Sequence, residues 1–262
     1  MKILVKFPTR GREHFPRILQ RYQETRVTDD VHYLITVDSD DPVMTNWSMQ
    51  NLISLWGNQT TQTIEPIGKI GAINHGVTEY LEQHPEYDII LLASDDMYPV
   101  QRGWDQRIIN DMERLYPDTD GVLWYNDGHT GNELNTMCIL GKKYYQRFGY
   151  IYQPDYKALW CDNEFMDVAN MLGKQTYSPD VLFEHKHPIY DRSIKQDYMN
   201  VRDSQQFLND KAIYEQRKQR NFDLTVNSDT NNKQPEGKVQ QPGIGVKPAN
   251  KVGRPRKQRS DM

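Results

Sequence analysis

Apolar and polar residues alternate along residues 1–117 in blocks that have the lengths of strands and helices. Short apolar runs predict strands at residues 2–7, 31–37, 60–65 and 89–93. Apolar residues that recur every three or four positions predict helices at residues 15–22, 70–81 and 104–115. Strands and helices that follow one another in turn are typical of an α/β protein. We therefore predict a doubly wound, mostly parallel sheet for the N-terminal half.

The pattern changes after residue 117. Strands are predicted at Gly121–Tyr125 and Leu134–Leu140, on either side of a polar loop, and a tyrosine-rich helix at Lys142–Phe148. A last short strand is predicted at Val181–Phe183, before a polar helix at Tyr198–Phe222. These elements predict a mixed α/β half that forms the second wall of a cleft.

The strand predicted at Ile89–Ala93 is central to the N-terminal half, because its unbroken apolar run indicates burial on both faces. Ser94, Asp95 and Asp96 follow this strand directly. Ligands bind at the carboxyl edge of open α/β sheets, and carboxylates at that edge can hold a divalent ion against a phosphate. A simple turn is the alternative interpretation, since Ser and Asp are common turn residues.

Three more polar groups are predicted near the same edge of the sheet. Pro8, Thr9 and Arg10 follow the first strand, in a loop where a phosphate or a base can bind. Asp38 follows the second strand, where a carboxylate commonly accepts hydrogen bonds from a ribose or a base edge. Lys69 brings a positive charge to a helix start with small residues around it, which would let a ligand approach closely. Ordinary turns with solvated side chains are the alternative for the first two groups.

Two later segments carry further candidate residues. Asp162 and Glu164 stand at the start of a predicted helix, close to the aromatic side chain of Trp160. They can serve as a general base and a hydroxyl-binding partner, or they can simply stabilise the start of the helix. His185 and His187 follow the last predicted strand, where they can ligate a metal or be packed or solvated.

Composition predicts one soluble domain with a tail. The chain has 262 residues, of which 37% are hydrophobic and 26% charged. Lys2 and Lys6 interrupt the first apolar stretch, and no window reaches the roughly 18 apolar residues of a spanning helix, so we expect a cytoplasmic protein. Cys138 and Cys161 lack the spacing of a metal site, and we predict that both are reduced and buried.

Charge is unevenly distributed along the chain. Residues 225–262 contain eight Lys or Arg and three acids, whereas residues 1–224 contain 24 basic and 33 acidic residues. A folded part of net charge −9 therefore carries a tail of net charge +5. The tail is rich in Asn, Gln, Pro, Gly and Lys and has almost no apolar residues, so we predict that it is disordered.

The order of these motifs resembles the nucleotide-sugar-dependent glycosyltransferases of the GT-A fold, specifically those of the family 2 type. The resemblance covers about residues 1–190 and rests on Pro8-Thr9-Arg10, Asp38, Gly68-Lys69 with Ala72 and Asn74-x-Gly76, Ser94-Asp95-Asp96, residues 160–165 and a late histidine. It implies a nucleotide-sugar half at residues 1–117, an acceptor half at 118–198 and a C-terminal helix at 199–224.

The resemblance also implies roles for individual residues. Asp96 corresponds to the carboxylate that holds Mn²⁺ or Mg²⁺ against the diphosphate of the donor, and Asp95 to its neighbour at the ribose or around the metal. His185 and His187 both match the late metal ligand loosely, and the choice between them stays open. Asp162 corresponds to the family's catalytic aspartate.

The remaining implied roles concern the donor and the acceptor. Pro8, Thr9, Arg10, Asp38 and Lys69 are expected to bind the nucleotide sugar, Glu164 to be the second catalytic acid, and Trp160 to contact the acceptor. If the anomeric centre inverts, the acceptor hydroxyl needs a general base, which would be Asp162.

Two positions depart from the family pattern. Ser94 stands where many relatives have a third acid, and Cys161 stands where a glutamate often precedes the base. The first departure puts a full Asp-x-Asp ligand set in doubt, and the second puts the assignment of the base in doubt.

Residues 251–259 resemble an AT-hook, a peptide that places arginines in the narrow minor groove of A·T-rich DNA. Arg254 and Arg256 would make these contacts, and the acceptor would then be a hydroxylated pyrimidine in double-stranded DNA, as expected of a viral (phage) enzyme in the host cytoplasm. The alternatives are a tail that binds polyanions without specificity and an acceptor that is a surface glycan, a protein or a metabolite. A non-catalytic protein that binds a nucleotide or sugar and is tethered to nucleic acid is the alternative from another functional class.

Overall fold

The structure, a computed structural model, describes residues 1–186 and 204–224. The chain divides into two compact units, Met1–Leu224 and Thr225–Met262. The second unit lies outside the described residues, and so does the AT-hook-like motif with Arg254 and Arg256. His187 also lies outside the described residues.

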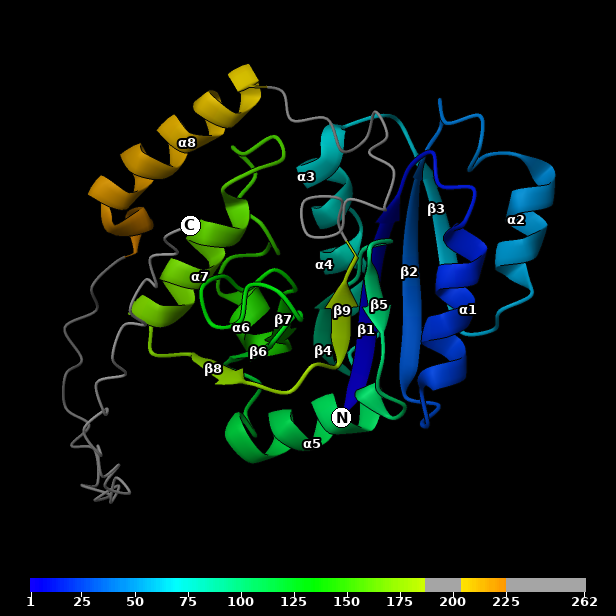
Figure 1. Cartoon of the computed structure of the whole chain (residues 1–262), viewed down its shortest axis with the longest axis horizontal. Helices are drawn as coiled ribbons and strands as arrows, with labels where there is room; N and C mark the ends of the chain where they lie inside the picture. Colours follow the sequence, from blue (N-terminus) through cyan, green and yellow to red (C-terminus); the bar gives the residue numbers. More distant parts are fainter. Residues whose placement is uncertain (187–203, 225–262) are drawn as a thin grey trace, which may run out of the picture. The chain divides into compact units, whose positions relative to one another are not determined.

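A seven-stranded mixed sheet with strand order β3-β2-β1-β4-β7-β6-β8 forms the centre of the first unit (Figure 1). The strands β3, β2, β1 and β4 are parallel, β7 runs antiparallel to β4 and to β6, and β8 is parallel to β6. A second sheet pairs β5 with β9. The strands are β1 (Lys2–Thr9), β2 (Val31–Asp38), β3 (Gln59–Ile64), β4 (Tyr87–Leu92), β5 (Met97–Pro99), β6 (Val122–Tyr125), β7 (Ile139–Gly141), β8 (Gln175–Ser178) and β9 (Phe183–His185).

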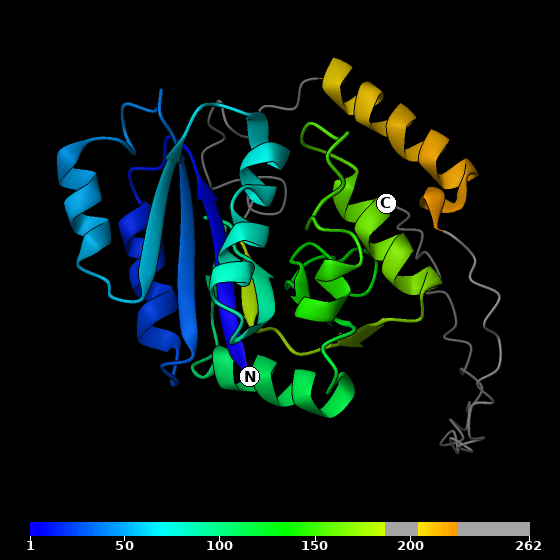
Figure 2. The ribbon, with the colours of Figure 1, turned by 180° about the vertical axis from the view of Figure 1, so that it is seen from behind.

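Helices cover both faces of the large sheet, as Figures 1 and 2 show from opposite sides. Alternate residues of β1 enter two separate cores: Ile3 and Val5 pack with side chains of α1, α2 and α5, whereas Leu4 packs with side chains of α3, α4, α6 and α7. The helices are α1 (Phe15–Thr25), α2 (Trp47–Ser54), α3 (Gly68–Asn74), α4 (Val77–Gln83), α5 (Trp104–Leu115), α6 (Lys142–Gln146), α7 (Cys161–Met171) and α8 (Ser204–Gln219), followed by the 3₁₀ helix η2 (Asn221–Asp223). The predicted doubly wound, mostly parallel α/β sheet is confirmed.

The structure differs from the sequence prediction where tertiary contacts outweigh local pattern. The helix predicted through residues 70–81 is split into α3 and α4, because Gly76 adopts a left-handed φ of 73°. The strand predicted at Leu134–Leu140 is confined to β7. The elements α2, β5 and β8 were not predicted; β8 is polar and half-buried, and its pairing with β6 defines it.

Two further predictions concern cysteines and membrane segments. Cys138 and Cys161 are both free and buried, as predicted. Among residues 1–186 and 204–224, no helix has the length and apolar character needed to cross a membrane.

Candidate active site

The carboxyl end of β4 meets β9 at the small second sheet. Met97 of β5 pairs with His185 of β9, and the backbone N–H of Lys186 donates to the carbonyl of Asp96 over 2.7 Å. This pairing brings the His185 Nε2 atom to 3.5 Å from Asp96 Oδ2. The predicted metal-binding residues Asp96 and His185, which are 89 positions apart in the sequence, are therefore neighbours in the fold.

Asp127 lies on the other side of the His185 ring and was missed by the sequence prediction. Its Oδ2 atom is 3.5 Å from His185 Nδ1, and its backbone carbonyl accepts the N–H of His185 over 2.9 Å. The Asp127 carboxylate also accepts hydrogen bonds from the N–H groups of His129 and Thr130 and from the Thr136 hydroxyl. An acid two residues after the end of β6 is the signal that would have found it, since the same logic found Asp96 after β4.

The two carboxylates determine the protonation of the imidazole between them. Burial disfavours the charged ring, but the hydrogen bonds to Asp127 and Asp96 outweigh burial and raise the pKa of His185 to about 9. Burial also opposes the charge on Asp96, yet the bonds from His185 and Ser94 lower the pKa of Asp96 to about 2. The pKa of Asp127 is lowered in the same way, against the effect of burial, by His185 and by its backbone hydrogen bonds. A protonated His185 thus bridges two carboxylates.

Asp162 in the first turn of α7 and Lys69 in the first turn of α3 belong to the same region. Burial raises the pKa of Asp162, and the positive charges of Lys69 and His185 reduce that rise. Lys69 also helps to lower the pKa of Asp96, after the larger effects of burial, His185 and Ser94. The charge of Lys69 therefore acts on the pKa of both carboxylates.

The loop after β1 is held by ion pairs to neighbouring strand ends. Arg10 Nη1 donates to Asp38 Oδ2 over 2.7 Å and also pairs with Asp40. Arg12 pairs with Asp95, whose pKa is raised by burial even though the arginine opposes that rise. Thr9 at the end of β1 is buried, and its hydroxyl has no hydrogen-bond partner among the described residues. The structure therefore brings the predicted residues Thr9, Arg10, Asp38 and Asp95 to one edge of the sheet.

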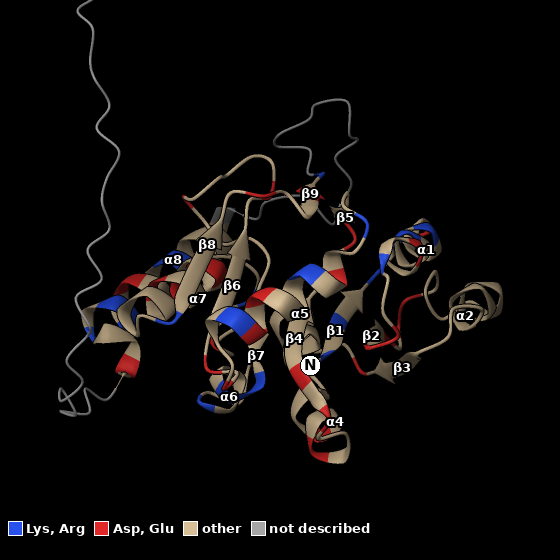
Figure 3. Ribbon diagram, turned by 90° about the horizontal axis from the view of Figure 1, so that it is seen from below, with Lys and Arg blue, Asp and Glu red and all other residues tan. Residues whose placement is uncertain are grey.

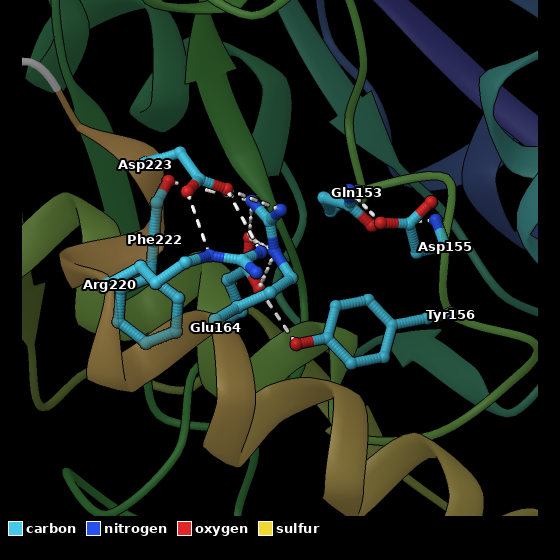
Figure 4. A network of polar contacts seen from close by, with 8 residues as sticks. Gln153, Asp155, Tyr156, Glu164, Arg220, Phe222 and Asp223 are labelled. Atoms are coloured by element: carbon cyan, nitrogen blue, oxygen red, sulfur yellow. Dashed lines mark hydrogen bonds and ion pairs between the residues drawn. The ribbon is translucent and has the colours of Figure 1, made fainter.

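Glu164 is engaged inside the fold, as Figure 4 shows. Its side chain is buried, with the Arg217 Nε atom 2.8 Å from Oε2, and the Tyr156 hydroxyl donates to Oε2 over 2.7 Å. Its catalytic role stays a prediction, and these contacts favour a structural role.

Trp160 immediately precedes α7 and has a left-handed φ of 62°. Its ring centroid is 5.1 Å from that of Tyr214 and 5.6 Å from that of Phe207, both of α8. The indole Nε1 atom is buried and has no acceptor among the described residues. Contact of Trp160 with an acceptor stays a prediction.

Asp96 and His185 offer a carboxylate and an imidazole as possible ligands for a divalent cation. Within the part of the chain that the structure describes, no group of three or more His, Cys, Asp or Glu side chains is arranged to hold a metal ion. One carboxylate and one imidazole nevertheless suit Mn²⁺ or Mg²⁺ that keeps waters and binds phosphate oxygens, since Mg²⁺ usually takes only one or two carboxylates from a protein. Asp127 then occupies the position of the carboxylate that commonly orients a metal-ligating histidine.

Solved structures of other proteins are similar to this fold. No family model matches the sequence, and no curated protein matches it. Among solved structures, a mannosyltransferase from Pyrobaculum calidifontis in complex with GDP-Man and Mn²⁺ matches 71% of this chain with a TM-score of 0.55 and 15% identity. The residues 1–349 of S. aureus TarS in complex with UDP-GlcNAc match 78% of this chain with a TM-score of 0.57 and 13% identity.

The match spans 56% of the mannosyltransferase chain and 62% of the TarS chain. At such low sequence identity these similarities show the fold alone. The chain has the GT-A-like α/β fold found in these nucleotide-sugar glycosyltransferases, as predicted.

Proposed function

We propose that this protein is a metal-dependent glycosyltransferase that moves a sugar from a nucleoside-diphosphate sugar to an acceptor hydroxyl. One observation carries the proposal: His185 Nε2 of β9 lies 3.5 Å from Asp96 Oδ2 after β4, and the charge of Lys69 acts on the pKa of Asp96 and on the pKa of Asp162. A GT-A-like fold with a metal-compatible pair, an exposed lysine at Lys69 and a half-buried carboxylate at Asp162 supplies the groups that such a transfer needs.

The donor nucleotide is assigned to the loop after β1 and the end of β2. Pro8 and Thr9 end β1 beside this loop, and the unpartnered Thr9 hydroxyl can donate to a ligand. Arg10 and Asp38, which pair with each other, can pair instead with a phosphate and with the nucleoside. Asp95 lies between this loop and Asp96, close to the expected position of the ribose.

Asp96 and His185 would hold Mn²⁺ or Mg²⁺. The bound cation would supply compensation for the negative charge that develops on the departing diphosphate. His185 must lose its proton to become a ligand, so cation binding is coupled to proton release. Asp96 is ionised well below neutral pH and is ready to act as a ligand.

Asp162 is assigned as the general base for an inverting transfer. Burial raises the affinity of its carboxylate for a proton, which suits a group that must accept one from the acceptor hydroxyl. Lys69 would interact with the phosphates, because its charge lies within electrostatic reach of both Asp96 and Asp162.

Replacing Asp127 with Asn tests the metal site through a residue that does not contact the cation. We expect Mn²⁺ affinity, measured by calorimetry in the presence of a nucleoside diphosphate, to fall by about 10- to 100-fold, because His185 loses the carboxylate that orients it. Asp118→Asn, at an exposed carboxylate that pairs with Lys143, is the control. Unchanged Mn²⁺ affinity in Asp127→Asn would show that the Asp127 carboxylate does not orient a metal ligand.

The proposed activity is tested by incubating the full-length protein with Mn²⁺ and a panel of nucleoside-diphosphate sugars. We expect slow hydrolysis of one donor, or transfer when an acceptor is present, and loss of both in EDTA. Binding of a nucleotide sugar without any turnover would favour the non-catalytic binding protein instead. Absence of both binding and turnover across the panel would contradict the proposal.

For the acceptor, we propose double-stranded DNA that carries a hydroxylated pyrimidine, as in a viral enzyme. Support comes only from the AT-hook-like sequence around Arg254 and Arg256, which lies outside the described residues. Along the described ribbon, Lys and Arg positions lie among Asp and Glu positions (Figure 3). A surface glycan, a protein or a metabolite is the alternative acceptor.

Changing both Arg254 and Arg256 to Ala tests the DNA proposal. We expect the full-length protein to bind A·T-rich duplex better than G·C-rich duplex, and the double variant to lose most of this preference. Deletion of residues 225–262 should also reduce the salt dependence of binding, because fewer counterions are released. The measurement is a salt series of binding isotherms on both duplexes. Lack of duplex binding at low salt would leave an enzyme with a different acceptor.

A further inference from the structure

One face of α8 contacts the segment that leads into α7. Phe207, Asp210, Tyr214 and Arg217 recur at helical spacing and all contact residues between 156 and 167. Tyr214 and Lys218 both bind the Asp167 carboxylate. This face of α8 is polar and aromatic, so specific hydrogen bonds and ion pairs, rather than apolar packing alone, determine how it binds α7.

Asp210 binds the backbone of the segment before α7. Its side chain is fully buried, and its carboxylate accepts the backbone N–H groups of Lys157, Ala158 and Leu159 at 3.1, 3.0 and 2.9 Å. Three consecutive N–H groups that converge on one buried carboxylate hold their segment in a single conformation. Trp160, with its left-handed backbone, follows directly, so the position at which α7 begins depends on Asp210.

Arg217, on the same face of α8, binds the first turn of α7. Its guanidinium makes hydrogen bonds of 2.8 to 3.1 Å to Glu164 in the first turn of α7, and it also pairs with Asp223. Figure 4 shows Glu164 together with Tyr156 and Asp223 in this network. Asp210 therefore fixes the chain three residues before Asp162, and Arg217 fixes it two residues after.

We propose that α8 is a positioning element for the active site and that Asp210 and Arg217 are positioning residues for Asp162. The inference rests on the proposed function, in which Asp162 accepts a proton from the acceptor hydroxyl. A displacement of about 1 Å in a catalytic group can cost about 10²-fold in rate. We therefore expect the rate of transfer to depend on the contacts of Asp210 before Asp162 and of Arg217 after it. Donor binding, which the proposed function assigns to the loop after β1, the end of β2, α3, the end of β4 and β9, would be unaffected.

Asp105 provides a matched control, because it makes the same kind of contact away from the site. It is fully buried on α5, and it accepts the N–H groups of Val27 and Thr28 at 3.0 and 2.7 Å. Asp105→Asn and Asp210→Asn both place an amide where a carboxylate accepted backbone N–H groups. We expect both variants to lower Tm, since each leaves buried donors poorly paired.

The two variants are expected to differ in catalysis. At a temperature well below both Tm values, Asp210→Asn should lower kcat by about 10-fold or more with the donor Kd within about twofold of wild type, whereas Asp105→Asn should keep the wild-type kcat. Arg217→Met should behave like Asp210→Asn, and Arg217→Lys should restore part of kcat. If Asp210→Asn does not fold, the Arg217 pair of variants decides the question.

Hydrogen exchange gives a readout that does not depend on turnover. In Asp210→Asn the amides of residues 156–165 should exchange faster than in wild type, and those of β1 and β4 should not. Unchanged exchange at 156–165 in Asp210→Asn, or a wild-type kcat in Asp210→Asn and in Arg217→Met, would overturn the inference and leave the proposed function intact. A wild-type protein with no turnover would overturn the proposed function, and exchange would still show whether α8 holds this segment.

Discussion

Replacing Asp162 with Asn is expected to lower the rate of sugar transfer by about 10²-fold or more while donor binding stays nearly intact. The amide keeps the size of the side chain and removes its ability to accept a proton. Asp162 lies at the start of α7, and the proposed function assigns the diphosphate to Asp96, His185 and Lys69, so we expect that its charge is not needed to hold the diphosphate. Transfer kinetics and donor calorimetry on the same protein make this comparison.

The pH profile adds a second readout for Asp162. A general base must be ionised, and burial raises the pKa of Asp162, so transfer by wild type should fall as the pH drops through this raised pKa. The residual activity of Asp162→Asn should lack that limb of the profile.

Asp155→Asn is the control for Asp162→Asn. Asp155 is exposed, and its carboxylate accepts a hydrogen bond from the side chain of Gln153, two residues before it (Figure 4). We expect it to transfer sugar at the wild-type rate. If Asp162→Asn loses donor affinity or unfolds while Asp155→Asn does not, then Asp162 stabilises the start of α7 and is not the base.

Replacing Asp96 with Ala is expected to abolish the part of donor binding that depends on Mn²⁺. Wild type should bind a nucleoside-diphosphate sugar only weakly in EDTA, since Asp95 and Asp96 lie at the expected position of the diphosphate and like charges repel. Adding Mn²⁺ should tighten binding by about 10-fold or more in wild type and leave Asp96→Ala unchanged.

Calorimetry with and without EDTA measures the donor affinity of wild type and of Asp96→Ala. Asp118→Ala, at an exposed carboxylate, should retain the full response to Mn²⁺. Equal affinity of wild type for the donor in EDTA and in Mn²⁺ would remove the metal from the proposal.

The sequence by itself determined the N-terminal half of the fold. Strands β1, β2 and β4 are mostly apolar, and α1 and α5 carry an apolar stripe, so the local pattern specifies the element and, in the helices, the face that it buries. Since parallel strands end at the same edge, the acids that follow β2 and β4 were correctly expected to lie there. The polar strand β8 and the break at Gly76 have no such periodic signal.

Tertiary structure alone decided how each candidate side chain is used. Asp162 and Glu164 are two residues apart and look equivalent in the sequence, but Arg217, 53 residues after Glu164, buries Glu164 in an ion pair and leaves Asp162 half-buried. In the same way, His185 meets Asp96 and Asp127 only because β9 pairs with β5. The role of a carboxylate depends on its charged and hydrogen-bonding partners and on its burial. Residues distant in the chain supply both, so a local sequence pattern does not encode them.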